Sequence, residues 1–190
     1  MKYYSDTAIS KELKIRYANR SDIKAILSWL NNKKNLMLFQ EFYLEDIEEW
    51  FDLSEKGKEK LFILSDDNLE FGFVSIVGID QRNYNCQLGR LIISNESMKG
   101  QGYGTLVTQL LLNYAFEQLN MHKVSVRVGE TNIASIKCVL NSGFRFMGRE
   151  RDGLFRGEYY VDMLDFDILI NEWNEFQKKL INNNPKVEFI

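Results

Sequence analysis

The sequence predicts a single α/β domain of the α+β kind, and three observations support this prediction. Short apolar segments typical of strands alternate with longer segments whose apolar residues recur every three or four positions, as they do in amphipathic helices. A glycine-rich loop at residues 98–105 joins an apolar run to one of these helical segments. Three consecutive strand-like segments between residues 60 and 93 predict a meander. Strands and helices that follow one another in this way favour helices packed on a sheet.

The first third of the chain predicts one strand and two helices. Residues 13–17 alternate apolar and polar side chains as a strand does, and Ser21 is expected to cap the helix that follows. One face of that helix carries Ile23, Ile26, Leu27 and Leu30. Residues 31–43 show no clean period and predict a loop, whereas the acids of segment 45–51 indicate the first turn of a second helix.

The remaining elements follow from the same patterns. Strands are predicted at 60–65, 71–79 and 87–93, separated by turns at 66–68 and 80–85. The glycine loop opens a helix whose apolar face holds Val107, Leu110, Leu111, Tyr114, Ala115 and residue 118 or 119. A strand at 123–128, a helix at 133–142, two strands near 144–152 and 159–167, and a helix at 170–181 complete the order. Asp152–Gly153 and Arg156–Gly157 are expected to join the last two strands, and a loose tail is expected from Asn182.

Length and composition indicate one domain over residues 1–190, with a core at 13–169 and an added helix and tail at 170–190. The 190 residues are 45% hydrophobic, enough for one sizeable core and too few for two domains. The net charge is only −3, from 24 basic and 27 acidic residues that are mixed along the chain. This balance argues against a nucleic-acid partner.

The chain carries no sign of a membrane, disulfide or metal role. Its first six residues lack the apolar core of a signal peptide, and no run approaches ~18 apolar residues, so we expect a cytoplasmic protein with no membrane partner. Cys86 and Cys138 are too few for a disulfide framework. His122 is the only histidine, which excludes most metal sites and any nucleophile that depends on histidine. No metal is therefore expected.

The glycine loop has the features of an anion site. It follows the apolar run 88–93 and opens a helix, where unpaired backbone N–H groups and the helix dipole favour negative charge. The spacing of Gly100, Gly102 and Gly104 matches neither the dinucleotide fingerprint nor the nucleoside-triphosphate loop. An ordinary turn from strand to helix is the alternative interpretation.

A second motif follows the strand at 123–128. Asn132 begins a short helix that ends at Gly143–Phe144. Asn132 is a natural helix cap and Gly143 a natural left-handed terminator, so each residue has a purely structural explanation as well.

Together these residues resemble the GNAT acetyltransferase superfamily. The loop is similar to its coenzyme A pyrophosphate loop, with Lys99 where Arg or Gln is usual, and Asn132 with Gly143–Phe144 is similar to its Asn-x-x-Ala/Ser motif. The resemblance spans about 13–169 and is nearest to the ribosomal-protein N-terminal, polyamine and amino-sugar acetyltransferases. It implies a mixed, mostly antiparallel central sheet with helices on both faces, and acetyl-CoA as co-substrate.

The resemblance also implies site residues. The cofactor-binding set is Leu91, Ile92, Ile93, Lys99, Gly100, Gln101, Gly102, Tyr103, Gly104, Thr105, Asn132 and Ser135. The amine attacks the thioester directly, so positioning supplies much of the rate. The usual glutamate base and tyrosine acid are replaced by Gln87 and Val139. Ser135 is the candidate acid, and Gln87 is expected either to orient a water or to be a solvated sheet residue.

The acceptor is expected to meet the 31–43 loop and the 152–158 hairpin. Phe39, Glu41, Tyr43 and Phe155 are the candidate contacts. Aromatic rings beside mixed charges suit a peptide N-terminus or another primary amine, and an amino sugar or its nucleotide is the alternative. A catalytically inactive acyl-CoA sensor is the alternative of another class. The oligomeric state, monomer or homodimer, is left open.

Overall fold

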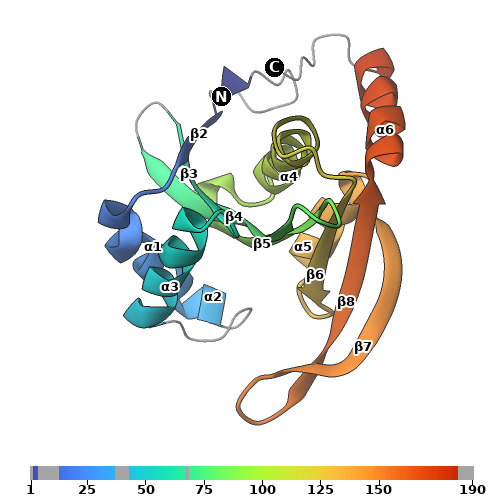
Figure 1. Cartoon of the computed structure of the whole chain (residues 1–190). Helices are drawn as coiled ribbons and strands as arrows, with labels where there is room; N and C mark the ends of the chain where they lie inside the picture. The colour runs from blue at the N-terminus through green and yellow to red at the C-terminus, as the bar shows by residue number, and fades with distance from the viewer. Residues whose placement is uncertain (1, 4–12, 37–42, 67–68, 184–190) are drawn as a thin grey trace.

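The computed structural model describes residues 2–3, 13–36, 43–66 and 69–183, and one mixed sheet of eight strands runs through them (Figure 1). The strand order is β1-β2-β3-β4-β5-β6-β8-β7. Only β5 and β6 pair in parallel, so the expected mostly antiparallel mixed sheet is confirmed. The strands are β1 (Lys2–Tyr3), β2 (Leu13–Tyr17), β3 (Lys60–Ser65), β4 (Glu70–Asp80), β5 (Asn85–Ile93), β6 (Lys123–Gly129), β7 (Arg145–Phe155) and β8 (Tyr160–Leu169).

Helices cover both faces of the sheet, as expected (Figure 1). They are α1 (Ile23–Leu30), α2 (Lys33–Leu36), α3 (Leu44–Glu55), α4 (Tyr103–Asn113), which continues as a π-helical turn over Tyr114–Gln118, α5 (Ile133–Asn141) and α6 (Ile170–Asn183). Single 3₁₀ turns lie at Arg20–Asp22 and Glu96–Met98. We call the side of the sheet that packs against α4 and α5 the α4 face, and the side that packs against α1 and α3 the α3 face.

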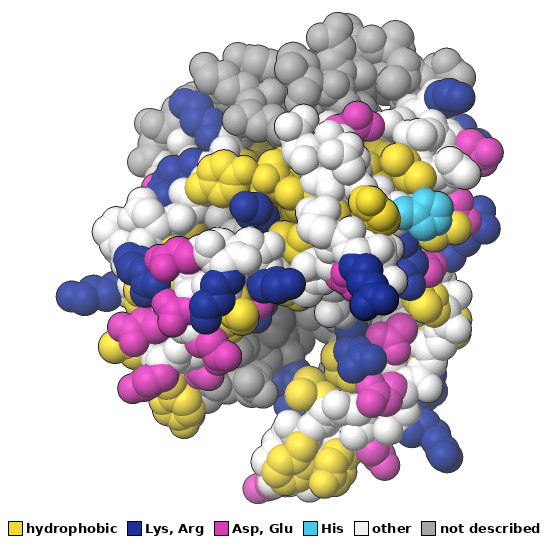
Figure 2. Space-filling model, in the orientation of Figure 1, with side chains coloured by type: hydrophobic (Ala, Val, Ile, Leu, Met, Phe, Trp, Pro, Cys, Tyr) yellow, Lys and Arg dark blue, Asp and Glu magenta, His cyan; other side chains and the backbone are white. Residues whose placement is uncertain are grey.

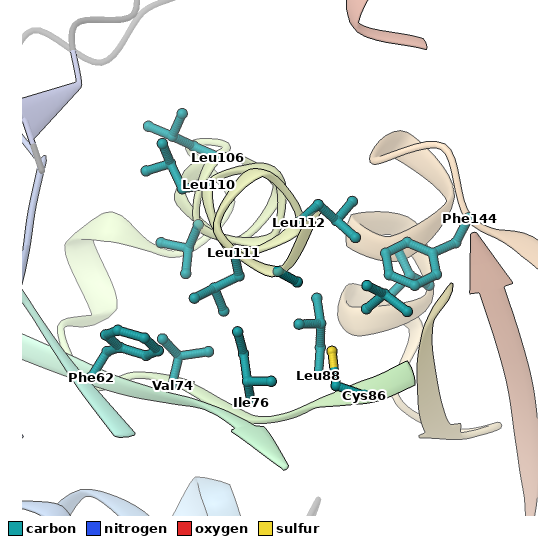
Figure 3. Close-up of a cluster of buried hydrophobic side chains, with 14 of the residues drawn as sticks. Phe62, Val74, Ile76, Cys86, Leu88, Leu106, Leu110, Leu111, Leu112 and Phe144 are labelled. Atoms are coloured by element: carbon teal, nitrogen blue, oxygen red, sulfur yellow. The ribbon is translucent and has the colours of Figure 1, made fainter. Parts of the chain in front are cut away.

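The larger core lies on the α4 face. Leu111 of α4 points toward Val74, Ile76 and Leu88 of the central strands, whereas Leu106 and Leu110 lie on the other side of the helix, and Phe144 lies at the far end of the cluster (Figure 3). Of the expected inner face of α4, Val107, Leu110, Leu111 and Ala115 are buried, whereas Tyr114 and Leu119 are half-buried and Gln118 is exposed. Leu112 and Phe116 are buried too, and Phe116 stacks on Trp173 of α6. The sheet contributes Phe62, Val74, Ile76, Cys86 and Leu88 to this cluster.

The smaller core on the α3 face joins two helices to the middle of the sheet. Its helix residues are Ile23, Ile26, Leu30, Ile47, Trp50 and Phe51, which pack on Leu61, Ile63, Phe73 and Ile92. Three of the four apolar residues expected on α1 are fully buried there, and Leu27 packs against their edge.

Four local expectations are wrong, two of them because a side-chain hydrogen bond decides the local structure. Asn19, not Ser21, caps the first helical turn, because its side chain accepts the N–H of Ser21 while Asp22 returns a bond to the N–H of Asn19. Segment 31–43 is not all loop, since residues 33–36 form α2; residues 37–42 lie outside the described part.

The other two differences lie near the C-terminus. Asp152 and Gly153 sit inside β7 at a register shift, where the N–H of Asp152 donates to Asp162. The hairpin turn is therefore the second pair, Arg156–Gly157. α6 continues through Asn183, so the expected tail cannot begin at Asn182.

The parallel pair β5 and β6 separates part-way along its length. Pairing covers Asn85–Leu88 and Lys123–Val126, whereas β5 continues to Ile93 and β6 to Gly129. Backbone groups beyond Leu88 and Val126 therefore lack the neighbouring strand as a partner, and space opens between the two strands.

Candidate active site

A cavity of about 230 Å³ lies where β5 and β6 separate. Its walls come from β4 to β8 and from the helices of the α4 face. They are formed by Val74, Leu88, Gly89, Arg90, Leu91, Thr108, Leu111, Val126, Arg127, Val128, Gly129, Asn132, Ser135, Cys138, Val139, Leu154 and Met163.

The cavity is lined by residues from both faces of the sheet. Leu111 and Cys138 reach it from α4 and α5 on the α4 face. Val128 belongs to the core of that face, and side chains alternate along a strand, so Arg127 points to the α3 face. Residues whose side chains belong to both faces of the sheet therefore contribute to the cavity wall.

The glycine loop places a helix N-terminus beside this cavity. Gly102 is the N-cap of α4, with φ +89° and no side-chain cap, and its carbonyl accepts the N–H of Leu106. The N–H groups of the first helical turn have no partner within the helix, as in an anion site. A Cβ added at Gly100 or Gly102 would meet nothing within 4 Å, so a ligand can approach the loop closely.

The polar residues of the loop are engaged with one another. Lys99 Nζ lies 2.8 Å from a carboxylate oxygen of Glu96, three residues earlier. The Gln101 side chain donates to the Ser97 carbonyl at 2.6 Å, and its backbone N–H lies 3.4 Å from the Met98 carbonyl, a long contact. These contacts fix the shape of the loop before any ligand binds.

Gly104 has a different role from the other two glycines. A Cβ at this position would lie 2.7 Å from Cys138 Sγ and 3.9 Å from Leu91 Cδ2. Glycine here lets α4 approach α5 closely, beside two residues of the cavity wall. Burial raises the pKa of the Cys138 thiol, which stays protonated at neutral pH.

We expect Gly104→Ala to lower the free energy of unfolding by about 1–3 kcal/mol, because the new methyl group overlaps Cys138. In a Cys138→Ala background the overlap disappears, and alanine then gains from its better helix propensity. Urea unfolding of the four proteins of this cycle measures the coupling. Equal costs in the two backgrounds would contradict the packing role of Gly104.

A β-bulge shapes β5 at the cavity wall. Phe73 pairs with Ile92 and Ser75 with Gly89, so two residues of β5, Arg90 and Leu91, lie opposite Val74 alone. Arg90 has φ +52°, a left-handed conformation that is uncommon outside glycine. The bulge turns Leu91 toward the cavity. The side chains of Ile92 and Ile93 instead pack in the α3-face and α4-face cores.

Asn132 and Ser135 lie together at the start of α5. The Asn132 side chain accepts the N–H of Ser135 at 3.2 Å, and both residues line the cavity. Val139, at the position of the usual tyrosine acid, is buried in the same wall. Gly143, with φ +89°, ends the helix in the left-handed conformation that its sequence position predicts.

Two arginines supply the charge in the cavity wall. Arg90 pairs with Glu59 at 2.7 Å, and Arg127 pairs with Asp165 at 2.8 Å and Glu150 at 3.0 Å. The hydrogen bond to Asp165 raises the pKa of Arg127 further above its ordinary value. Among the lining residues none is a carboxylic acid, so the described part of the wall offers no carboxylate as a base.

The structure does not bring Gln87 to the cavity. Its neighbour Leu88 packs on the α4 face and lines the cavity, so the Gln87 side chain points to the α3 face, beside Val77 and Ser125. Gln87 is not among the residues that line the cavity, which favours its alternative interpretation as a polar residue of the sheet.

Of the four expected acceptor contacts, the structure describes Tyr43 and Phe155. Phe39 and Glu41 lie outside the described residues. Tyr43 is 60% exposed at the start of α3, and Phe155 is 54% exposed near the end of the β7–β8 hairpin, where it packs on Tyr160. Neither lines the cavity.

Arg90, Arg127, Met163 and Thr108 line the cavity but were not expected from the sequence. A glycine inside a strand pattern, such as Gly89, often marks a β-bulge, and this signal could have identified its neighbour Arg90. The other three reach the cavity only through strand and helix pairing, and no local pattern marks them.

Comparison with known proteins identifies the family of this chain. The sequence profile of the acetyltransferase (GNAT) domain matches residues 12–145. The chain belongs to this family. It is therefore an acyltransferase that uses acetyl-CoA as its co-substrate, as the resemblance implied.

Curated relatives are ribosomal and spermidine acetyltransferases. A putative ribosomal N-acetyltransferase of Bacillus subtilis is 29% identical over 102 residues, which are 54% of this chain and only 55% of that protein. A spermidine N(1)-acetyltransferase of Vibrio cholerae is 26% identical over 172 residues, covering 87% of this chain and 97% of that protein.

A solved structure shares the fold. The Vibrio cholerae spermidine N-acetyltransferase in complex with CoA and spermine superposes with a TM-score of 0.76 at 22% identity, over 85% of this chain and 98% of that chain. In the described part of this chain, no group of three or more candidate ligands that could hold a metal ion is found. None of the described helices combines the length and apolar character that crossing a bilayer requires.

Proposed function

We propose that this GNAT protein acetylates a primary amine by direct attack of the amine on acetyl-CoA, with no acyl-enzyme intermediate. The observation that carries the proposal is the cavity between β5 and β6, which is lined by residues from both faces of the sheet. The first turn of α4 adjoins the cavity on one face, since Gly104 lies against Cys138 and Leu91. An acyl donor and an amine can then approach the same point from opposite faces.

The residues around the cavity fit acetyl-CoA. Backbone N–H groups at Gly102 to Thr105 are suited to its pyrophosphate, and the open space beside Gly100 and Gly102 gives them access. The wall formed by Leu91, Val126 and Asn132 is suited to the acyl arm. When bound, acetyl-CoA supplies a thioester carbonyl as the electrophile.

The proton steps follow from the residues present. Since the described wall has no carboxylate, the acceptor ammonium loses its proton to water, and the neutral nitrogen forms the new N–C bond. The attacking nitrogen loses its second proton to water as the C–S bond breaks, and the Ser135 hydroxyl donates a proton to the leaving thiolate. Water then returns a proton to Ser135. The protonated Cys138 is not a nucleophile in this scheme.

The acceptor we propose is a small-molecule amine, with polyamines as the first class to test. The spermidine acetyltransferase relative aligns along nearly its whole length, whereas the ribosomal relative aligns along about half. On the α3 face, Asp165 and Glu150 flank Arg127 beside the cavity, and these carboxylates can receive the ammonium groups of a flexible amine. A cytoplasmic location and a single domain are part of the same proposal.

Release of free CoA thiol from acetyl-CoA tests the proposal. The acceptor panel is spermidine and spermine, peptides with varied N-terminal residues, and amino sugars with their nucleotide forms. Turnover with a polyamine supports the proposal, and turnover with peptides or amino sugars alone overturns the acceptor class. Calorimetric binding of acetyl-CoA without turnover of any amine favours the sensor interpretation instead.

We expect Ser135→Ala to lower kcat about 10- to 100-fold while the dissociation constant of acetyl-CoA changes little, because the hydroxyl acts only as the thiolate leaves. Ser142→Ala is the matched control, since that hydroxyl lies at the end of the same helix and donates to the Cys138 carbonyl. An unchanged kcat for Ser135→Ala would rule out Ser135 as the acid.

A further inference from the structure

A buried ion pair lies directly behind the cavity wall. The Arg90 guanidinium contacts both carboxylate oxygens of Glu59, at 2.7 and 3.4 Å, and lies 3.9 Å from the ring centroid of Trp50. Arg90 Nη1 also donates to Ser75 Oγ at 3.3 Å. The three partners come from α3, from the residue before β3, and from β4, so three elements meet on one side chain.

This arrangement lowers the stability of the fold unless the surrounding contacts keep each part of it in place. The side chains of Glu59 and Arg90 are only 7% and 22% exposed, and buried charges lose their hydration. Arg90 also adopts φ +52°, a conformation that persists only where the surroundings impose it. Strained residues of this kind cluster at functional sites, and Arg90 itself lines the cavity.

The contacts reach the backbone of the bulge on both sides of Arg90. Ser75 Oγ accepts from the Arg90 guanidinium and donates to the Gly89 carbonyl at 3.1 Å. On the other side of Arg90, Leu91 turns into the cavity because of the extra residue in β5. Bulges next to active sites commonly re-aim a side chain in this way.

We infer that Glu59 and Trp50 are positioning residues that act through Arg90, and that they hold the β5 backbone at Gly89–Leu91 in the shape that receives the acyl arm of acetyl-CoA. The inference rests on the proposed use of the cavity for the acyl arm. Glu59 touches neither the cavity nor the glycine loop, so its effect is limited to the part of the ligand that the bulge contacts.

Binding measurements with two ligands distinguish the positioning role of Glu59 from a loss of folding. Glu59→Gln removes the negative charge from Arg90 and keeps the size of the side chain. We expect it to weaken acetyl-CoA binding about tenfold in calorimetry and to lower kcat by a similar factor, because the acyl arm is misplaced. Binding of the nucleotide half of CoA, adenosine 3′-phosphate 5′-diphosphate, is expected to stay within about twofold of wild type, since the glycine loop alone holds it.

Asp22→Asn is the matched control. Asp22 is also buried and pairs with an arginine, Arg16, through two contacts of 2.8 Å, but it does not line the cavity. It is expected to lose stability while keeping both affinities and kcat. Arg90→Lys retains the charge facing Glu59 and is expected to fall between wild type and Glu59→Gln.

Equal weakening of both ligands by Glu59→Gln, or unchanged binding of both, would overturn the positioning role. A wild-type protein that turns over no amine would instead refute the proposed function, and the two binding measurements would still test the role of Glu59. The thermal midpoint of each variant, measured alongside, keeps loss of folding apart from loss of binding.

Discussion

Gly102→Val is expected to weaken acetyl-CoA binding about 100-fold, which corresponds to about 2.7 kcal/mol. The valine side chain would fill the open space beside the first turn of α4, where the backbone N–H groups are proposed to meet the pyrophosphate. Charge-assisted hydrogen bonds of this kind contribute about 1.5–3 kcal/mol each, so the loss of one or two of them accounts for the effect. Calorimetry with acetyl-CoA measures it.

Gly102→Val is also expected to lower the stability of the protein, and this effect needs its own control. Gly102 has φ +89°, and a side chain in the left-handed region costs about 1–2 kcal/mol of stability. Gly57 lies in the turn after α3 with φ +71° and equally open space around its Cα. Gly57→Val is therefore expected to lose similar stability and to bind acetyl-CoA as wild type does. Acetyl-CoA binding by Gly102→Val within about twofold of wild type would reject the placement of the anion site.

The elements of this fold were predictable because their signals are local. The expected bounds of β2 and β3 coincide with the structure, since alternation and flanking turn residues mark both ends of each strand. The errors lie where a side chain decides the boundary. Asn19 and Ser21 are both good caps, and only the reciprocal bond from Asp22 selects Asn19.

The site residues likewise divide into those in short local motifs and those placed by contacts between distant elements. The glycine loop and the pair Asn132 and Ser135 are short motifs, and the structure places both beside the cavity. Gly104 belongs to the loop by sequence, yet its missing side chain serves the contact with Cys138 on another helix. Arg90 depends on a register shift between β4 and β5, which no local pattern specifies. Local sequence therefore predicts the proposed acetyl-CoA side of this site better than it predicts the walls of the cavity.

The proposed acceptor side is the least predictable part, because it consists of paired charges on neighbouring strands. Figure 2 shows basic and acidic side chains side by side over the strands next to the hollow between α3 and the β7–β8 hairpin. Arg127 meets Asp165 across one strand pair and Glu150 from the strand beyond. In the sequence these residues look like ordinary surface charge, and only the pairing of β6, β8 and β7 brings the two carboxylates beside Arg127, which lines the cavity.

Trp173→Ala is expected to lower the free energy of unfolding by about 3–5 kcal/mol, a large share of the stability of a typical domain. Trp173 is 0% exposed, although it lies on α6, beyond the core expected at 13–169. Its ring stacks on Phe116, in the π-helical turn that follows α4, and on Phe176. The side chain thus ties the last helix to the core of the α4 face.

Phe155→Ala is the control for this change, because it removes a large aromatic ring that is 54% exposed. It is expected to shift stability by no more than about 0.5 kcal/mol. Urea unfolding of both variants, followed by tryptophan fluorescence and circular dichroism, distinguishes the two possibilities for α6. If α6 is part of the core, Trp173→Ala shifts a single cooperative transition to lower urea; a loss below about 1 kcal/mol, or a separate early transition, would make α6 an appendage. Because α6 packs on the turn after α4, we expect the first outcome.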